Sequence, residues 1–316
     1  MGLYVLRRLL AIPPLLLGAS LLIFLLLRFS PGDPAEVILA QAGSYATDRQ
    51  AIAELRSAWG LDLSLPVQYG RWLRQALGGE LGRSFATNRP VAGLVAERLP
   101  ATLLLTTGAL VVAASLAVPL ALVSATRAGG VVDAAARLFA LTAVSMPAFW
   151  LGLLLVWLFA VRLGWLPATG GDTPRHLVLP VLVLAAGVAA GEMRLLRASL
   201  LDVLAAPSTT VARAKGLPER LVLRRHVLRA ALIPFVTSFG LSVGSLLGGA
   251  AVVETVFAYP GLGKLAVDAI GQRDYPVIQA FALVTTLVFV LTSLAVDVAY
   301  ALIDPRIRVG ARPAAG

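Results

Sequence analysis

The chain has 316 residues, of which 58% are hydrophobic and 14% charged, and its mean hydropathy is +0.84. Soluble domains usually carry about 25% charged residues, so this composition excludes an ordinary water-soluble protein. A net charge of +10 would suggest nucleic-acid binding in a soluble protein, but here the basic residues flank apolar blocks, which excludes that function. The lack of cysteine excludes disulfides, thiolate metal sites and cysteine nucleophiles.

The first apolar block covers residues 9–28 and follows Arg7 and Arg8. Its length of about twenty residues matches the roughly 30 Å hydrocarbon core that a transmembrane helix crosses. A secretory signal would end in a small-x-small cleavage site, which this block lacks. We therefore expect residues 1–28 to form a retained N-terminal transmembrane helix.

Residues 29–100 contain no second apolar block of that length. With Arg28 at its edge, the stretch carries eight basic and seven acidic residues, so it is nearly neutral, as a translocated segment can be. Leu55, Trp59 and Trp72 indicate short amphipathic helices on the outer surface. We expect this stretch to be a small folded extracytoplasmic cap.

Five further apolar blocks are each long enough to cross the membrane. They cover residues 101–125, 137–161, 177–198, 231–256 and 279–303. The chain is thus predicted to be all-α and polytopic, with about six transmembrane helices, a five-helix core at 101–304 and a cytoplasmic tail at 305–316. Prolines in these blocks remove backbone donors and are expected to kink the helices. They include Pro119, Pro147, Pro180 and Pro234.

Basic residues gather in the connection between the fourth and fifth spans, residues 199–230, and near both termini. Because cytoplasmic loops carry an excess of arginine and lysine, this connection is predicted to be cytoplasmic, and six spans then place both termini on the same side. The basic cluster begins at the end of the fourth span and runs through this connection: Arg194, Arg197, Arg213, Lys215, Arg220, Arg224, Arg225 and Arg229.

Residues 207–218 of this connection carry helix start and stop signals. Ser208 can cap a short helix, Gly216 suits the left-handed position after its end, and Pro218 prevents continuation. The pattern predicts a helix of about two turns, roughly 10 Å long. Its small residues would allow close approach to a groove on a partner protein, but the spacing fits a simple connecting turn equally well.

A second segment with turn-forming residues follows the fifth span. Pro260, Gly261 and Gly263 are predicted to end that helix sharply at the outer boundary. Glu254, an ionisable group near membrane depth, marks either a gate or a structural ion pair with an outer base such as Lys264, and the sequence leaves both open.

Polar and small residues inside the spans raise related questions. Glu192 is a second embedded carboxylate, whereas Asp297 is expected to pair with Arg306. Hydroxyl groups of the fifth span are candidates for a solute path, on polarity alone. They are Thr237, Ser238, Ser242 and Ser245. Glycines at four-residue spacing predict close helix packing, and a role in lining a pore is the alternative; they are Gly187, Gly191, Gly240, Gly244 and Gly248.

No set of residues suited to catalysis is apparent. His176 and His226 are the only histidines, they fall on opposite predicted faces of the membrane, and no clustered carboxylates accompany them as a metal site needs. The chain has no G-x-x-x-x-G-K-[ST] loop, so any ATP hydrolysis must take place on another chain. We expect a transport protein without a cofactor and not an enzyme.

The run Ala212-Arg213-Ala214-Lys215-Gly216 resembles the coupling loop of permease subunits of bacterial ATP-binding-cassette importers. The signature of that loop is Glu-Ala-Ala, three residues and Gly. Gly216 matches the Gly and Ala212 the last Ala, while Thr210 and Val211 replace the Glu and the first Ala. The form seen here is typical of the branch that imports peptides, nickel and glutathione.

Further short motifs of that branch follow in the same order and spacing along nearly the whole chain, and they match the permease with the long first outer loop. In the cap they are Pro31-Gly32-Asp33-Pro34, Trp59-Gly60-Leu61-Asp62, Pro66-Val67-Gln68-Tyr69 and Gly82-Arg83-Ser84-Phe85. Beyond the cap they are Arg98-Leu99-Pro100-Ala101-Thr102, the run 254–263, Arg273-Asp274-Tyr275-Pro276 and Asp304-Pro305-Arg306.

The resemblance implies a permease of the bacterial cytoplasmic (inner) membrane that works with a second permease, two cytoplasmic ATPases and an outer solute-binding protein. The ATPase-coupling residues would be Ser208, Thr210, Ala212, Arg213, Ala214, Lys215 and Gly216. The outer gate or the surface facing the binding protein would include Glu254, Phe257, Pro260, Gly261, Gly263, Arg273 and Asp274.

The solute is left open, because dipeptides, oligopeptides, nickel, glutathione and sugars are all carried by similar permeases. The alternative class is an ion-coupled secondary transporter, which needs membrane-embedded ionisable groups and often has inverted repeats. This sequence has few such groups and no visible repeat, so the importer permease is the favoured interpretation.

The arginine distribution predicts that residues 29–100 lie outside and residues 199–230 inside. In this cysteine-free chain, Ser44→Cys should react with a membrane-impermeant thiol reagent added to intact cells, and Ser208→Cys should not. Labelling at position 208 with protection at position 44 would reverse the orientation.

Overall fold

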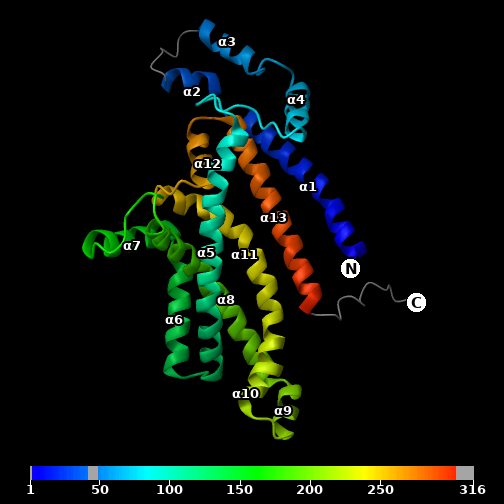
Figure 1. Ribbon diagram of the computed structural model, residues 1–316, viewed down its shortest axis with the longest axis vertical. Helices are drawn as coiled ribbons and strands as arrows, with labels where there is room; N and C mark the ends of the chain where they lie inside the picture. The colour runs from blue at the N-terminus through cyan, green and yellow to red at the C-terminus, as the bar shows by residue number, and fades with distance from the viewer. Residues whose placement is uncertain (1, 42–48, 304–316) are drawn as a thin grey trace. The chain divides into compact units, whose positions relative to one another are not determined.

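The computed structural model describes residues 2–41 and 49–303, and side chains within 9–40 and 49–296. The predicted tail, the predicted pair of Asp297 with Arg306, and position 44 lie outside the described residues. The first helices are α1 (Gly2–Phe29), α2 (Pro34–Gln41), α3 (Arg49–Ala58), α4 (Leu65–Leu77) and α5 (Val91–Thr126). The next are α6 (Val131–Ser145), α7 (Ala148–Leu155), the π-helix η1 (Val156–Arg162) and α8 (Arg175–Ala205). The last are α9 (Pro207–Ala214), α10 (Glu219–Leu221), the π-helix η2 (Val222–Val227), α11 (Leu228–Val256), α12 (Leu262–Gly271) and α13 (Tyr275–Ile303), as Figure 1 shows.

The predicted all-α fold is confirmed: in the described ranges the only bridge between extended residues joins Arg83 and Pro90. Five helices of the described chain are long and apolar enough to span a membrane, and a sixth span is completed if α6 and α7 with η1 are counted together. The prediction of about six spans therefore holds.

The third predicted span, residues 137–161, is broken and not merely kinked. Helix α6 begins at Val131, ends at Ser145, and is bent by 107° from the helical segment 148–162. Met146 has an extended backbone and Pro147 lies at the N-cap of α7. The proline ring disfavours a helical conformation at the residue before it, so the helix stops there.

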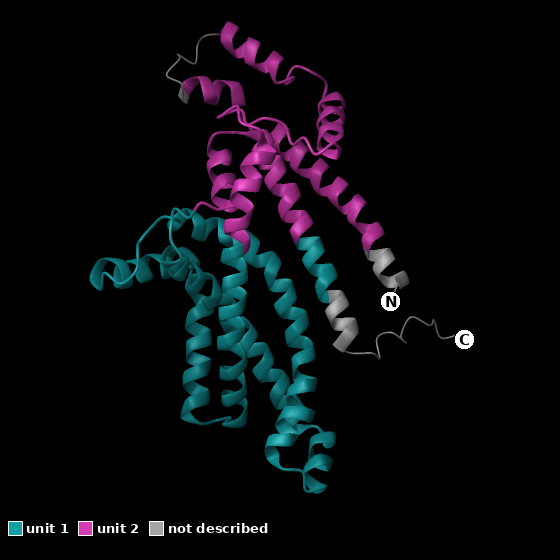
Figure 2. Ribbon diagram, in the orientation of Figure 1, with its two compact units in different colours: residues 1–5, 104–259, 289–316 teal, residues 6–103, 260–288 magenta. Residues whose placement is uncertain are grey.

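Contacts divide the chain into two compact units, coloured separately in Figure 2. Unit 1 comprises residues 1–5, 104–259 and 289–316, and unit 2 comprises residues 6–103 and 260–288. The units do not coincide with the predicted domains 1–28, 29–100 and 101–304, because residues 260–288 pack with the cap. That linear division into domains remains a prediction.

Unit 2 confirms the short helices predicted for the cap, which are α2, α3 and α4. Its apolar core joins Val91 and Leu94 of α5 to Leu262 of α12 and Val277 of α13. The rings of Trp59 and Phe85 stack with centroids 4.0 Å apart. The cap is thus a packed structure with its own aromatic and aliphatic contacts.

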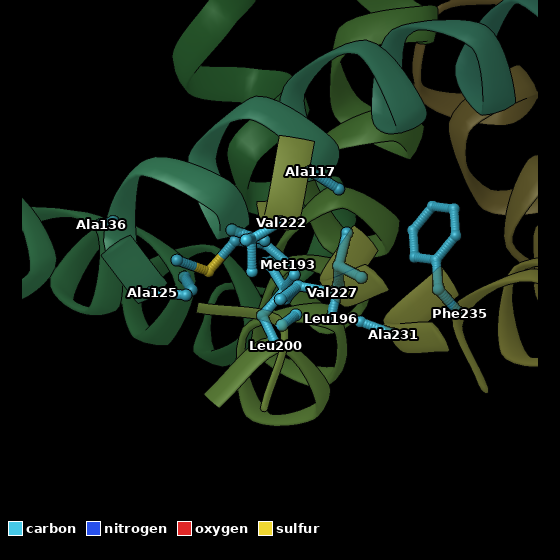
Figure 3. Close-up of a cluster of buried hydrophobic side chains, with 14 residues drawn as sticks. Ala117, Ala125, Ala136, Met193, Leu196, Leu200, Val222, Val227, Ala231 and Phe235 are labelled. Carbon is cyan, nitrogen blue, oxygen red and sulfur yellow. The ribbon is translucent and has the colours of Figure 1, made fainter. Parts of the chain in front are cut away.

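Unit 1 is built on small residues. Alanines recur at every fourth position of α5, and all of them are buried, so neighbouring helices approach that face closely. They are Ala109, Ala113, Ala117, Ala121 and Ala125. Figure 3 shows Ala117 and Ala125 in one cluster with Met193, Leu196 and Leu200 of α8. The same cluster extends to Val222 and Phe235, which joins α8 to η2 and α11.

The glycine faces predicted from sequence differ in whether another helix of the chain packs against them. A methyl group at Gly240 would lie 2.1 Å from Val296 Cγ2, and one at Gly244 would lie 2.5 Å from the ring of Phe289, so α11 meets α13 there without room for a side chain. Around Gly187, Gly191 and Gly248 no atom lies within 4 Å of such a methyl group. The prediction of close packing is therefore confirmed at Gly240 and Gly244 and wrong within this chain at the other three.

A buried ion pair joins three helices of unit 1. Asp133 of α6 is 1% exposed and receives Nε of Arg197 at 2.7 Å and Nη2 at 2.9 Å. Ser124 of α5 donates its hydroxyl to the same carboxylate, and the Gly129 amide donates at 3.0 Å. Because every carboxylate oxygen has at least two donors, the charge is compensated where α5, α6 and α8 meet.

Asp133→Asn should destabilise the protein, because Arg197 would keep a largely buried charge without a counter-ion. We expect the apparent Tm of the detergent-purified complex to fall by roughly 5 °C or more, measured by size-exclusion chromatography after heating. Arg137→Gln is the control, because Arg137 is exposed and lies 3.6 Å from Asp133. Equal shifts in the two variants would contradict a special role for the buried pair.

Candidate functional site

Helix α9 provides the short helix predicted in the connection between α8 and α11. It has eight residues and begins at Pro207, with Ala206 as the N-cap. The prediction that Ser208 caps this helix is wrong, because Pro207 already occupies the first helical position, where its fixed φ favours helix initiation. Thr209, which the sequence argument did not single out, donates its hydroxyl to the Val203 carbonyl at 2.6 Å and ties α9 to the end of α8.

The end of α9 follows the sequence prediction. Gly216 has φ +75°, the left-handed region, and its amide donates to the Arg213 carbonyl at 2.9 Å. Pro218 is extended and starts α10. Across this turn Arg213 makes a two-pronged contact with Glu219, at 3.1 and 2.7 Å. These hydrogen bonds raise the pKa of Arg213 above its ordinary value.

The two faces of α9 differ in exposure. Thr209 and Ala212 are buried, and Ala212 belongs to the apolar cluster around α8 and η2. The sequence analysis expected Ala212 to lie at the surface that docks a partner. Its burial leaves almost no surface for such a contact, and its small size instead serves packing within this chain. The exposed face carries Ser208, Thr210, Val211, Arg213, Ala214, Lys215 and Gly216.

Val211 is the residue of this face that the sequence argument treated only as a departure from the family signature. Its side chain is 53% exposed, beside hydroxyl and basic residues. An apolar contact point with a cationic rim is a usual composition for a protein-binding surface. Arg220 of α10 and Arg224 and Arg225 of η2 are also exposed.

The outer end of α11 differs from the prediction. The helix ends at Val256, and Ala258 has φ +48°. The Tyr259 amide donates to the Glu254 carbonyl at 2.8 Å and the Ala258 amide to the Thr255 carbonyl at 3.2 Å, which is the Schellman arrangement. Pro260, Gly261 and Gly263 therefore do not end α11; Gly261 is the N-cap of α12.

Most of the residues predicted for an outer gate or a contact with a binding protein are buried within the chain. They are Glu254, Phe257, Gly261, Gly263 and Asp274, while Pro260 and Arg273 are partly exposed. Residues buried in this way offer no free surface to a binding protein in this structure, while their role in an outer gate stays a prediction. Burial also raises the pKa of the neighbouring Tyr259, and the Glu254 carboxylate acts in the same direction.

Asp274 has a structural role in unit 2. Its carboxylate accepts the hydroxyl of Ser84 and the Phe85 amide at 3.0 Å, so it ties the cap to the start of α13. Arg273, with φ +54°, forms the turn before it.

Phe257 of unit 1 fills the space next to Gly152, where a methyl group would lie 3.2 Å from its ring.

A cavity of about 340 Å³ lies between α8 and α11 in unit 1. Its lining includes Gly187, Gly191 and Glu192 of α8 and Ser242 and Ser245 of α11. The side chain of Glu192 is 3% exposed and lies in the middle of an apolar helix. An ionisable side chain at such a position usually marks a functional site.

The structure brings only part of the predicted solute-path set together. Ser238 and Ser242 donate to Glu192 Oε1 at 2.8 and 3.0 Å. Ser245 lines the cavity and donates to the Ser242 carbonyl at 2.9 Å. Thr237 donates to the Ile233 carbonyl of its own helix at 3.2 Å and is not part of the lining.

Two protein-family models match the sequence. The model "Binding-protein-dependent transport system inner membrane component" covers residues 117–309, and the model of the N-terminal part of such membrane components covers residues 1–106. The sequence is also 45% identical over 305 residues to the glutathione transport system permease protein GsiC of Salmonella paratyphi A. It is 45% identical over the same length to GsiC of Escherichia coli strain K12. In both cases the match covers 96% of this chain and 98% of the relative.

Solved structures share the fold. An inward-facing form of the MetNI methionine ABC transporter aligns with a TM-score of 0.55 at 20% identity, over 67% of this chain and 96% of the other. The crystal structure of an amino acid ABC transporter with histidines aligns with a TM-score of 0.51 at 18% identity, over 68% of this chain and 94% of the other.

Proposed function

Because this chain belongs to the binding-protein-dependent transport system inner membrane components, the permease subunits of ATP-binding-cassette importers, we propose that it carries peptide-like solutes such as glutathione. The observation that carries this solute class is the 45% identity to glutathione permeases over 96% of the chain. Membership of this family implies that the chain works with ATPase and binding-protein partners. It also implies that the chain crosses the inner membrane several times. A second permease would complete the path, and both termini would lie in the cytoplasm.

Helix α9 would be the docking element for one ATPase. Its exposed face combines an apolar side chain, Val211, with Arg213 and Lys215, and its other face is fixed to α8 by the Thr209 bond. A movement of α9 would therefore be passed to α8 through the backbone at Val203. Closure of the nucleotide sites would reach the membrane spans by this rigid connection.

On the outer side, exposed residues of unit 2 would contact the solute-binding protein. The exposed face of α12 presents Val267, Asp268 and Ile270. Asp268 also accepts Lys264 Nζ at 2.6 Å, one turn earlier in the helix. This face replaces the buried residues as the proposed contact, and the cap helices α3 and α4 would extend it.

Uptake by the reconstituted importer tests the function. Proteoliposomes that contain this chain with its second permease, ATPases and loaded binding protein should accumulate glutathione only when ATP is supplied. An ATPase subunit without its phosphate-binding lysine is the control and should abolish accumulation. Accumulation driven by an ion gradient without ATP would instead indicate a secondary transporter.

Gly216→Val tests the docking role of α9. A β-branched residue at φ +75° is strained by about 1–2 kcal/mol. In an exposed turn this should leave membrane insertion intact but displace the end of α9. We expect ATP-dependent uptake to fall severely, membrane abundance to stay near normal, and stimulation of ATP hydrolysis by the loaded binding protein to be lost.

Gly216→Asn is the matched control. Asparagine tolerates the left-handed region, and no atom lies within 4 Å of a β-carbon at this position, so the helix end should keep its shape. Uptake by the Asn variant should stay within about twofold of the wild type. Normal uptake with Val at position 216, or an equal loss with both residues, would show that backbone geometry at this turn is not what couples the ATPase to transport.

A further inference from the structure

The Glu192 carboxylate is only half satisfied. Its Oε1 accepts two hydroxyl groups, from Ser238 at 2.8 Å and Ser242 at 3.0 Å. Its Oε2 is buried and has no hydrogen-bond partner among the residues that the structure describes. An unpaired carboxylate oxygen in a buried, apolar position costs free energy, so the site favours a donor that comes from outside the chain.

The cavity supplies room for that donor. Glu192 forms part of its lining, together with two glycines of α8 around which a β-carbon would meet no atom within 4 Å. The volume of about 340 Å³ falls within the range of small-molecule sites, roughly 300–1,000 Å³. The remaining lining is mostly apolar, with Leu184, Val188 and Leu246 among its residues. The carboxylate is the one acidic group of this lining.

The donor set selects among ligands. The described residues contain no group of three or more His, Cys, Asp or Glu side chains that could hold a metal ion, and a hard cation needs six or more oxygen ligands. A primary ammonium group needs far less, because one carboxylate oxygen and nearby hydroxyl or carbonyl oxygens satisfy its three N–H bonds. The serines on Oε1 leave Oε2 free to accept such a bond.

We propose that Glu192 binds the free ammonium group of the transported solute inside the membrane. This inference rests on the proposed function, since peptides and glutathione share an α-ammonium group whatever their side chains. Ser238 and Ser242 are positioning residues, because their hydroxyl groups fix Oε1 and leave Oε2 as the acceptor for the ligand. Selection for a free amine then lies in the permease.

Glu192→Gln tests this proposal, because an amide keeps an acceptor for both serines and removes the negative charge. Uptake into proteoliposomes that contain the complete importer is measured for glutathione and for N-acetylglutathione, each at a concentration that gives measurable wild-type uptake. The readout is the ratio of variant to wild-type rate for each solute. In each ratio the variant and the wild type are measured with the same solute and the same binding protein. Any preference of the binding protein for one solute therefore cancels in the ratio.

We expect the ratio to fall about tenfold or more for glutathione and to stay near one for N-acetylglutathione. Thr237→Ala is the matched control: it removes a hydroxyl of the same helix that does not reach Glu192, and both ratios should stay within about twofold of one. An equal fall for both solutes would indicate a structural role, such as a pair with the second permease, and would overturn the proposal. An unchanged ratio for glutathione would also overturn it.

Failure of the proposed function looks different from failure of this inference. If the wild-type importer takes up neither solute with ATP, the peptide-like solute class is wrong and the inference falls with it. If the wild type takes up glutathione and Glu192→Gln does so at the same rate, the function stands and only the ammonium site is wrong.

Discussion

A lipid bilayer offers no hydrogen bonds, so each polar group within a membrane span must find its partner in the protein or in a ligand. Asp133 meets this requirement fully, because Arg197, Ser124 and the Gly129 amide surround its carboxylate. The arrangement of unit 1 depends on the ion pair of Asp133 with Arg197, because this pair holds α5 and α6 against α8. The same helix α8 carries Glu192 and the Val203 carbonyl that holds α9. One helix thus links the proposed ATPase contact to the cavity that Glu192 lines.

Packing between the spans relies on faces of small residues. Some of these faces are covered by other helices of the chain, and others are uncovered. The alanine face of α5 and the contacts of Gly240 and Gly244 are closed by other helices of the same chain. The glycines of α8 are open and border the cavity with Glu192. This face of α8 suits close approach but is left uncovered by the described residues of the single chain, and we propose that the second permease and the solute path lie on that side.

Three turns share one backbone device and differ in what their sequences reveal. Gly216, Ala258 and Arg273 all adopt positive φ after a helix end. Only the first is a glycine, so only that turn could be predicted from residue type. At the other two the helix-end hydrogen bonds impose the left-handed conformation on residues that rarely adopt it. This explains why Pro260 and Gly261 were assigned to the end of α11, when they belong to the start of α12.

The sequence by itself determined the membrane spans, the short cap helices and the two-turn helix that ends at Gly216, because hydropathy, helix length and glycine preference are local properties. Motif order also identified the family. The tertiary structure alone decided that Ala212 and Asp274 are buried, and that Ser238 and Ser242 meet Glu192. These outcomes depend on which residues, tens of positions apart, come to lie together. Hydropathy assigns each residue to water or lipid, but it does not choose the partner of a buried carboxylate.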